Sequence, residues 1–505
     1  MNELEMPDWL NQRVALSPDA PALFFNEPGG PTSEWTFATL QRDALELASR
    51  LQNFIVKGRP VALLLGNGPS FVLAIHALIQ LNAVTVPLNI RLTVPELLWQ
   101  LNDVGAGLLI SESRFTTQLA QFGQQRPDMR ILEIDKLLVV AGSDLDLSQL
   151  TPDLVEPRQH LNLDALHTII YSSGTTGRPK GIMLTYSNHW WSVIGSSLNL
   201  GLYPSDKWLA VLPLFHVGGL SLLFKSVIYG IPLVLHSSFQ EAAVNHAIDY
   251  EGVTIASVVS TMLVRMLDER HDKPYPPTLR CLLLGGGPAP QPLLERCAAI
   301  GAPVVQSYGL TETASQNTTL APADALTRLG SAGKPLFPNL LMIDAPDTEG
   351  IGEILVRGPT VTTGYWQRPD ETAIAVRNGW LHTGDLGRLD SAGFLYVLDR
   401  RSDLIISGGE NVYPAEVEAI LLSHPAIAEA GVFGLTDQSW GQIVTAAVRL
   451  RPGQSVTPTD LTAFLSTKLA RFKIPVKIFF VTPDQNLPRN AAGKLLRREL
   501  REQYK

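Results

Sequence analysis

Residues 171–181 have the sequence YSSGTTGRPKG, and they directly follow HTIIYS (167–172), an apolar run typical of a buried strand. Glycine and small hydroxyl residues let a backbone approach a polyphosphate closely and offer it N–H and O–H donors. Arg178 and Lys180 add positive charge for phosphate oxygens. The segment is not a Walker A loop, because that motif has Ser or Thr after its lysine and Gly181 stands there. The pattern favours a phosphate-binding loop over a polar surface turn.

The same strand pattern extends outward over the first 400 residues. Short β-branched apolar runs alternate with helical patterns, as expected where helices cover both faces of a parallel sheet. Residues 112–163 are more polar, and we assign them no chemistry. The predicted strands are PVALLLG (60–66), AVTVPL (83–88), GLLIS (107–111), TIASVVS (254–260) and CLLLG (281–285), and a helix is predicted at 71–80.

Near residue 400 the pattern changes, which predicts a second domain. Three consecutive charges, at 399–401, lie between two apolar runs, and paired glycines follow. We expect an α/β fold with a large N-terminal region of layered βα units, built from several subdomains, at 1–401. We expect a small α+β domain at 402–505, joined to the large region at about Ser402. The elements predicted there are helix 415–422, strands 429–433 and 445–450, helix 460–469 and strand 476–481.

The composition is that of an ordinary globular protein. The chain has 505 residues, 45% of them apolar and 17% charged, and a net charge of −8, which disfavours binding to nucleic acid. The acidic N-terminus does not match a signal peptide. Cys281 and Cys297 are the only cysteines, so we expect no disulfide framework and a cytoplasmic location. Residues 209–236 are apolar enough to span a bilayer, but glycines, prolines and Lys225 interrupt them, so we expect no membrane insertion.

Six further segments follow the phosphate loop in order, and together they resemble the adenylate-forming superfamily. This superfamily comprises acyl-CoA synthetases, peptide-synthetase adenylation domains and luciferases. The resemblance covers residues 21–500. The segments are GGGPAP (285–290), QSYGLTET (306–313), GEILVRGPTVTTGYW (352–366), WLHTGDLG (380–387), RSDLIISGGENVYPAEVE (401–418) and LPRNAAGKLLRREL (487–500).

The resemblance implies a site for ATP. It implies that Thr311 contacts phosphate and that Glu312 holds the Mg²⁺ that accompanies ATP, since a hard cation prefers carboxylate oxygen. Tyr308 is implied to stack on adenine, and Asp385 to accept from the ribose hydroxyls, with Arg400 as a second ribose contact. The implied nucleotide-binding residues are Ser172, Ser173, Gly174, Thr175, Thr176, Gly177, Lys180, Gly285, Gly286, Gly287, Tyr308, Gly309, Asp385 and Arg400.

The resemblance also implies that the small domain acts twice. Lys494 would bridge the substrate carboxylate and the α-phosphate while the acyl-adenylate forms. After a rotation about Ser402, Gly408 and Gly409 would serve thioester formation with coenzyme A. Relatives often carry Asp or Lys at the hinge, so Ser402 is a departure that says nothing about the rate of rotation.

Four segments point to a particular acid as the substrate. Residues 212–230, 282–297, 329–337 and 399–432 resemble the o-succinylbenzoate–CoA ligases of menaquinone and phylloquinone biosynthesis. His216 occupies the position that these ligases use between the acyl pocket and the pantetheine route. By region alone, Ser260, Thr261 and Met262, which follow a predicted strand, are expected to line the acyl pocket.

Lys225 is the one full charge within the apolar stretch 217–228, and such a charge is costly to bury without a partner. One reading is a lysine that snorkels from a helix end. The other is a cation for the unreactive ring carboxylate of o-succinylbenzoate, about one or two helical turns deeper than His216.

For some single residues, a purely structural role is the alternative to a functional one. His216 would also suit a core position, Tyr308 a core aromatic, and Asp385 a surface ion pair. For the whole chain, the alternatives are another acyl- or aryl-CoA ligase, a stand-alone carrier-loading enzyme, a luciferase-type oxygenase and an inactive nucleotide-binding regulator. The expected partners are ATP, a carboxylic acid and coenzyme A, and the sequence leaves a homodimer open.

Overall fold

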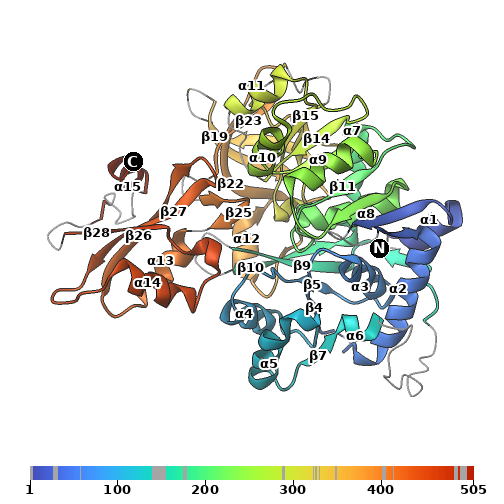
Figure 1. Cartoon of the computed structure of the whole chain (residues 1–505), viewed down its shortest axis with the longest axis horizontal. Coiled ribbons are helices and arrows are strands. Elements are labelled where there is room, and N and C mark those ends of the chain that lie inside the picture. Colours follow the sequence, from blue (N-terminus) through green and yellow to red (C-terminus); the bar gives the residue numbers. More distant parts are fainter. Residues whose placement is uncertain are drawn as a thin grey trace.

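The computed structural model describes residues 4–26, 32–56, 58–138, 155–173, 179–286, 291–321, 324, 327–328, 330–346, 348, 350–400, 405–412, 414–482, 487–488 and 497–505. Figure 1 shows a large body and a smaller lobe, coloured orange to red, that the C-terminal residues form. Among the described helices, none is long and apolar enough to cross a membrane. The apolar stretch 209–236 is divided between strand β11 (Trp208–Ala210), helix α8 (Val217–Tyr229) and strand β12 (Leu233–His236).

Two largely parallel sheets form the large body, as predicted. The six strand predictions of the first 400 residues and the helix at 71–80 are confirmed within a few residues. The seven-stranded sheet has the order β20 (Gly364–Tyr365), β10 (Pro179–Thr185), β9 (Leu166–Ser173), β5 (Thr85–Pro87), β4 (Val61–Leu64), β6 (Leu108–Ser111), β7 (Arg130–Glu133). The nine-stranded sheet has the order β17 (Lys334–Pro335), β16 (Thr318–Thr319), β15 (Val304–Tyr308), β14 (Cys281–Leu284), β13 (Ile255–Val258), β11, β12, β2 (Pro21–Asn26), β3 (Thr32–Thr36).

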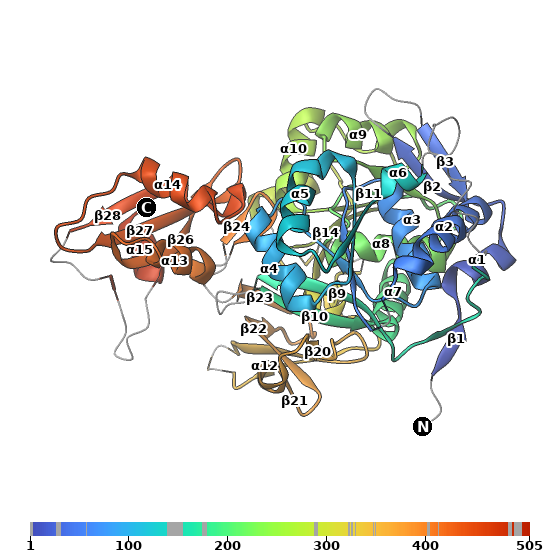
Figure 2. The same ribbon diagram turned by 90° about the horizontal axis from the view of Figure 1, so that it is seen from below.

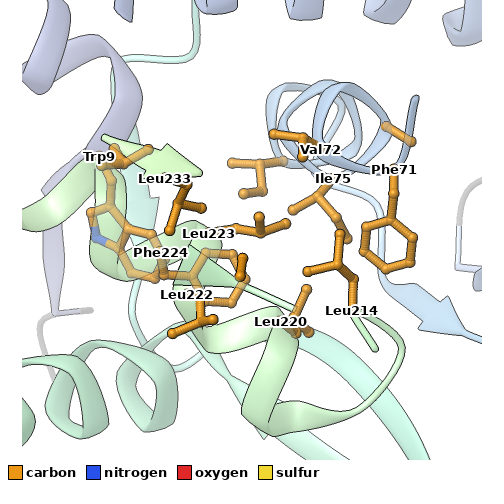
Figure 3. Packing of buried hydrophobic residues seen from close by; sticks show 14 of the residues in the cluster. Trp9, Phe71, Val72, Ile75, Leu214, Leu220, Leu222, Leu223, Phe224 and Leu233 are labelled. Atoms are coloured by element: carbon orange, nitrogen blue, oxygen red, sulfur yellow. The ribbon is translucent and has the colours of Figure 1, made fainter. Parts of the chain in front are cut away.

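Helices cover both faces of each sheet, which explains the nearly continuous apolar strands. In β11, Trp208 and Ala210 pack into one hydrophobic cluster and Leu209 into another, because successive side chains point to opposite faces. Helix α3 (Pro69–Gln80) is buried from Phe71 to Gln80, since it lies between the sheets against α8. Figure 3 shows side chains of these two helices interlocking in that layer. The other helices are α1 (Trp9–Leu16), α2 (Phe37–Leu51), α4 (Val94–Val104), α5 (Thr116–Gln125), α6 (Ile134–Leu138), α7 (Tyr186–Leu200), α9 (Glu241–Tyr250), α10 (Ser260–Arg270) and α11 (Gln291–Ala299).

A third, antiparallel sheet departs from the prediction of parallel layers throughout the first 400 residues. Near the end of its strand Trp380–Leu389, Asp385 and Gly387 are buried while Leu386 and Leu389 are exposed, as expected of a sheet with one wet face. Figure 2 shows this part, with helix α12 (Pro369–Ala375), on the side of the body opposite α9 and α10. Its strands are β18 (Leu340–Asp344), β19 (Gly352–Arg357), β21 (Val376–Arg377), β22 (Trp380–Leu389) and β23 (Leu395–Arg400), and a small separate pair joins β1 (Glu5–Pro7) to β8 (His160–Asn162).

The small lobe has hydrophobic clusters of its own, whose members all come after residue 404. All five predicted elements are present, although the two central strands are longer than predicted. The division at 401/402 stays a prediction, because residues 401–404 lie outside the described ranges. The elements are β24 (Ile405–Ser407), β25 (Glu410–Val412), α13 (Pro414–Leu422), β26 (Ile427–Asp437), β27 (Gly441–Leu450), α14 (Pro458–Ser466), β28 (Lys477–Val481) and α15 (Arg497–Gln503).

Candidate active site

A cavity of about 230 Å³ lies at the carboxyl ends of β13, β14 and β15. Its wall includes residues from the ends of these strands and from the loops that follow them, namely 257–259, 285–286, 307 and 309–311. Loops that follow parallel strands meet at one edge of an open sheet, and this edge is where such folds bind ligands. Leu212, Val217 and other apolar side chains give the cavity a largely apolar wall. The geometry is that of a small-molecule site.

Lys225 lies on this cavity about two turns into α8, and its side chain does not reach solvent. It is 2% exposed, so the snorkelling alternative is wrong. Its Nζ donates a hydrogen bond to Oε1 of Gln316 at 2.7 Å and lies 4.5 Å from the ring centroid of Trp208. Burial lowers the pKa of Lys225 to about 7. The apolar cavity therefore has a buried amine with no carboxylate among these contacts.

His216 is the N-cap residue of α8 and contacts a residue of the small lobe. Its Nε2 lies 3.3 Å from Oε2 of Glu410, and the other oxygen of Glu410 accepts from Nη1 of Arg91. The Glu410 side chain is 6% exposed, whereas those of His216 and Arg91 are 43% and 49% exposed. Burial raises the pKa of Glu410, but His216 and then Arg91 outweigh it, so that the pKa lies below its ordinary value. Glu410 is thus an ionised carboxylate between two groups of the large body.

Gly408 and Gly409 form the two-residue turn of the β24–β25 hairpin, in which Ser407 pairs with Glu410. Their φ angles are +58° and +83°, the left-handed values of a type I′ turn, which favours glycine at both positions. A Cβ on Gly408 would lie 2.5 Å from the ring of Trp440. The turn brings small-lobe backbone to the wall of the cavity.

Two residues predicted to bind adenosine are joined directly. The hydroxyl of Tyr308, at the end of β15, donates to Oδ2 of Asp385 on β22 at 2.8 Å. Asp385 is 5% exposed and Tyr308 is 7% exposed. This bond links the nine-stranded sheet to the antiparallel sheet. It places the implied adenine and ribose contacts side by side.

The predicted phosphate and metal residues meet at Tyr365. Its hydroxyl donates to Oε1 of Glu312 at 3.2 Å, and Nζ of Lys180 lies 5.0 Å from its ring centroid. Lys180 Nζ also lies 2.5 Å from Oε2 of Glu371. Glu312 and the hydroxyl of Thr311 offer oxygen donors of the kind Mg²⁺ takes. Because Mg²⁺ commonly uses one or two carboxylates together with substrate phosphates, this donor set fits the ion.

The phosphate loop connects two paired strands. Pro179 pairs with Ser173 and Lys180 with Ser172, so residues 174–178 join the ends of β9 and β10. Four of the predicted loop residues, Gly174 to Gly177, lie outside the described residues, as do Gly287, Ser402 and Lys494. For Ser173 and Arg400 the backbone alone is described. Their assigned roles stay predictions.

The cavity brings together some of the predicted residues and leaves others beside it. Ser260 and Thr261 begin α10, and the next residue, Met262, is on the cavity wall. Ser172, Lys180, Tyr308, Glu312 and Asp385 are not part of this wall. The predicted residues on the wall are His216, Lys225, Met262, Gly285, Gly286, Gly309, Thr311, Gly408 and Gly409.

Sequence reasoning missed Glu410, Arg91 and Gln316. Glu410 stands directly after the two glycines that were assigned to thioester formation, so a buried carboxylate in that motif was a usable signal. Arg91 and Glu410 are 319 positions apart, and Lys225 and Gln316 are 91 apart, so no local pattern connects them.

Known proteins share this architecture over the whole chain. Residues 10–366 match the AMP-binding enzyme family, and residues 416–494 match the AMP-binding enzyme C-terminal domain. The chain therefore belongs to the AMP-binding enzyme family. Among curated proteins, the 2-succinylbenzoate–CoA ligase of Geobacillus kaustophilus (strain HTA426) is 51% identical to it, over 98% of this chain and 97% of that protein.

Three solved structures of o-succinylbenzoate CoA synthetase from Bacillus subtilis, each 44% identical to this chain, superpose on it to different extents. A double mutant bound to the product analogue OSB-NCoA gives a TM-score of 0.90, over 99% of this chain and 98% of that one. The complex with the acyl-adenylate intermediate OSB-AMP gives 0.73, over 98% of both chains. The complex with ATP and magnesium ion also gives 0.73, over 98% and 100%. At the same identity and nearly the same coverage, the whole chain therefore superposes better on the product-analogue complex than on the other two.

Proposed function

We propose that this chain is a 2-succinylbenzoate–CoA ligase that works in two steps, in menaquinone or phylloquinone biosynthesis. The acid and ATP first give the acyl-adenylate and pyrophosphate. Coenzyme A then takes the acyl group and releases AMP. The observation that carries the proposal is one cavity whose wall contains the implied nucleotide residues Gly309 and Thr311, the buried Lys225, and the Gly408–Gly409 turn.

In the first step a carboxylate attacks the α-phosphate, so two anions must approach each other. Positive charge and hydrogen-bond donors that face the developing phosphorane lower this barrier. The phosphate loop and Lys180 are proposed to contribute donors to the phosphates, and Lys494 is proposed to bridge the two reacting groups. Thr311 and Glu312 would hold Mg²⁺, which neutralises charge on the phosphates.

In the second step the thiol of coenzyme A attacks the acyl carbon, the carbon–oxygen bond to AMP breaks, and AMP leaves with the electron pair. We propose that the thiol reaches the cavity past the Gly408–Gly409 turn, which is part of the cavity wall. That turn offers backbone without side chains, so it suits the close passage of a narrow pantetheine arm. His216 lies at the N-terminus of α8 and on the cavity wall, where the acyl group and the pantetheine arm would meet.

The substrate is a dicarboxylate, and the proposal gives its unreactive ring carboxylate to Lys225. An apolar cavity accepts such a group only if a cation or several donors meet it. Lys225 Nζ has Gln316 as a neutral hydrogen-bond partner. A bound carboxylate would supply the missing counter-charge.

A panel of aromatic and aliphatic acids tests the proposed function. The purified chain is incubated with ATP, Mg²⁺, coenzyme A and one acid at a time, and acyl-CoA and AMP are measured by mass spectrometry. We expect o-succinylbenzoate to give the highest kcat/KM. A higher kcat/KM for any other acid, or transfer to a carrier protein in preference to coenzyme A, would refute the assignment.

We further propose a cytoplasmic location. Cys281 and Cys297 are both unpaired and buried, and burial raises the pKa of the Cys281 thiol to about 12 and of the Cys297 thiol to about 11. Two unpaired thiols suit a reducing compartment. The homodimer stays a prediction that light scattering of the purified chain would test.

A further inference from the structure

A second contact between the two lobes is a buried cluster of three charges. Lys473, from the small lobe, donates from Nζ to Oε1 of Glu416 at 2.7 Å and to Oε1 of Glu96 at 2.9 Å. Glu416 lies on α13 in the small lobe, and Glu96 lies on α4 in the large body. The three side chains are 5%, 9% and 11% exposed, in the order Lys473, Glu416, Glu96. The cluster therefore joins the lobes through charges largely removed from water.

Within the small lobe, Lys473 and Glu416 already form a neutral pair. Burial raises the pKa of Glu416. Lys473 lowers this pKa and Glu96 raises it, and the net result is a pKa above the ordinary value. Burial alone would lower the pKa of Lys473, but Glu416 and then Glu96 outweigh it and raise the value. If the small lobe turned away, Lys473 would keep Glu416, and Glu96 would return to water. Because neither lobe would then hold a stranded buried charge, the contact suits an interface that opens and closes.

Glu96 is held in place by its own helix before the small lobe reaches it. Its Oε2 accepts from the backbone N–H of Thr93 at 2.8 Å and from Oγ1 of Thr93 at 2.7 Å, which forms the capping box of α4. Its other oxygen, Oε1, is the one that accepts from Lys473. A carboxylate fixed in this way loses little further freedom on contact.

We propose that Glu96 is a positioning residue for the thioester-forming step: by accepting the buried Lys473, it holds the small lobe in the orientation that sets the Gly408–Glu410 turn on the cavity. The inference rests on the proposed function, because the step in question is transfer to coenzyme A. It assigns to α4, in the large body, a role in selecting between two orientations of the small lobe.

Glu96→Gln tests this role, since glutamine can still accept from Thr93 but carries no charge for Lys473. Each half-reaction is measured separately: ATP–pyrophosphate exchange with o-succinylbenzoate, and acyl-CoA formation from pre-made acyl-adenylate. We expect acyl-CoA formation to fall about five- to tenfold, as for the loss of one charge-assisted contact between coupled parts. Pyrophosphate exchange should be unchanged or slightly faster.

Asp460→Asn is the matched control. Asp460 has the same capping-box position in α14, accepting from the N–H and Oγ1 of Thr457 at 3.1 and 2.6 Å, and its side chain is exposed. Both half-reactions should be unchanged in this variant. The Asp460 variant thus shows how the loss of a charged helix-capping side chain alone affects the rates of the two half-reactions.

Three results would overturn the inference. One is wild-type acyl-CoA formation in Glu96→Gln, and another is an equal loss in both half-reactions together with a lower melting temperature, which would make Glu96 a stabilising residue only. The third is the same selective loss in Asp460→Asn. If instead the wild-type chain forms no o-succinylbenzoyl-CoA, the proposed function fails. Glu96→Gln would then be compared with wild type on whichever acid supports pyrophosphate exchange.

Discussion

At the scale of single residues, Lys225 is the proposed binding partner of the ring carboxylate. Replacing Lys225 by Met removes the cation and keeps an unbranched apolar side chain. We expect KM for o-succinylbenzoate to rise about 10- to 100-fold, since binding shared by the ground state and the transition state is lost. KM for ATP should not change. Steady-state kinetics with a monocarboxylate analogue that lacks the ring carboxylate should distinguish the two proteins only weakly.

Lys207→Met is the control for this substitution. Lys207 Nζ also lies over an aromatic ring, 4.8 Å from the centroid of Phe24, but Lys207 is not on the cavity wall. The control should keep the wild-type KM for both acids. Equal behaviour of Lys225→Met and wild type toward the dicarboxylate would show that other donors hold the ring carboxylate.

The pH dependence of binding gives a second test at this scale. The pKa of Lys225 is lowered to about 7 by burial, and a bound carboxylate would raise it again. Below pH 7 the ammonium is already present, whereas above pH 7 the free protein must take up a proton when it binds the acid. We therefore expect KM for o-succinylbenzoate to increase from pH 7 to pH 9 in the wild type. The Lys225→Met variant should show a flat profile, and a parallel increase in both would exclude Lys225 as the cause.

At the scale of elements, the β24–β25 hairpin is the part of the small lobe that meets the cavity. Gly408→Ala places a Cβ against the ring of Trp440 at a φ of +58°, so the turn must shift. We expect acyl-CoA formation from the acyl-adenylate to fall about 10²-fold. A shift of about 1 Å in an element that positions the reacting groups can lower the rate by this much. This rate is measured in a single turnover, and a separate assay of ATP–pyrophosphate exchange should give nearly the wild-type rate.

Gly453 provides a control for Gly408→Ala, because its backbone is similar but its surroundings are open. It separates the effect of backbone strain from the effect of displacing the hairpin. Gly453 has a φ of +76°, and a Cβ there would have nothing within 4 Å. Gly453→Ala should therefore cost some stability to thermal unfolding without a selective loss of acyl-CoA formation. A loss equal to that of Gly408→Ala would mean that the hairpin acts through stability alone.

The elements also mark how far sequence reasoning extends. The parallel strands and the five small-lobe elements were predictable, because each has several consecutive apolar residues or a clear helical period. The antiparallel sheet was not, since β21 has two residues and β18 alternates only weakly. The nucleotide residues came from motifs that lie together in the chain. The contacts of Glu96 with Lys473, 377 positions apart, depend on the arrangement of two lobes and have no local signal.

At the scale of the whole molecule, Glu410 and Glu96 each contact the opposite lobe. Glu410→Gln should slow acyl-CoA formation about tenfold, because an uncharged side chain binds Arg91 and His216 less strongly. Glu96→Gln should do the same from the other lobe. In the double variant, measured losses that multiply would indicate two independent contacts. A double variant no slower than either single variant would indicate one shared closing step.

The central claim is that one small lobe serves two half-reactions in two orientations, and a pair of variants tests it most directly. Single-turnover rates of both half-reactions are measured for Lys494→Ala and for Gly408→Ala. Lys494→Ala should lower adenylation about 10²–10³-fold, since it removes one donor to the phosphorane, and should spare acyl-CoA formation from the pre-made adenylate. Gly408→Ala should show the opposite division. Equal losses in both half-reactions for either variant would contradict the account.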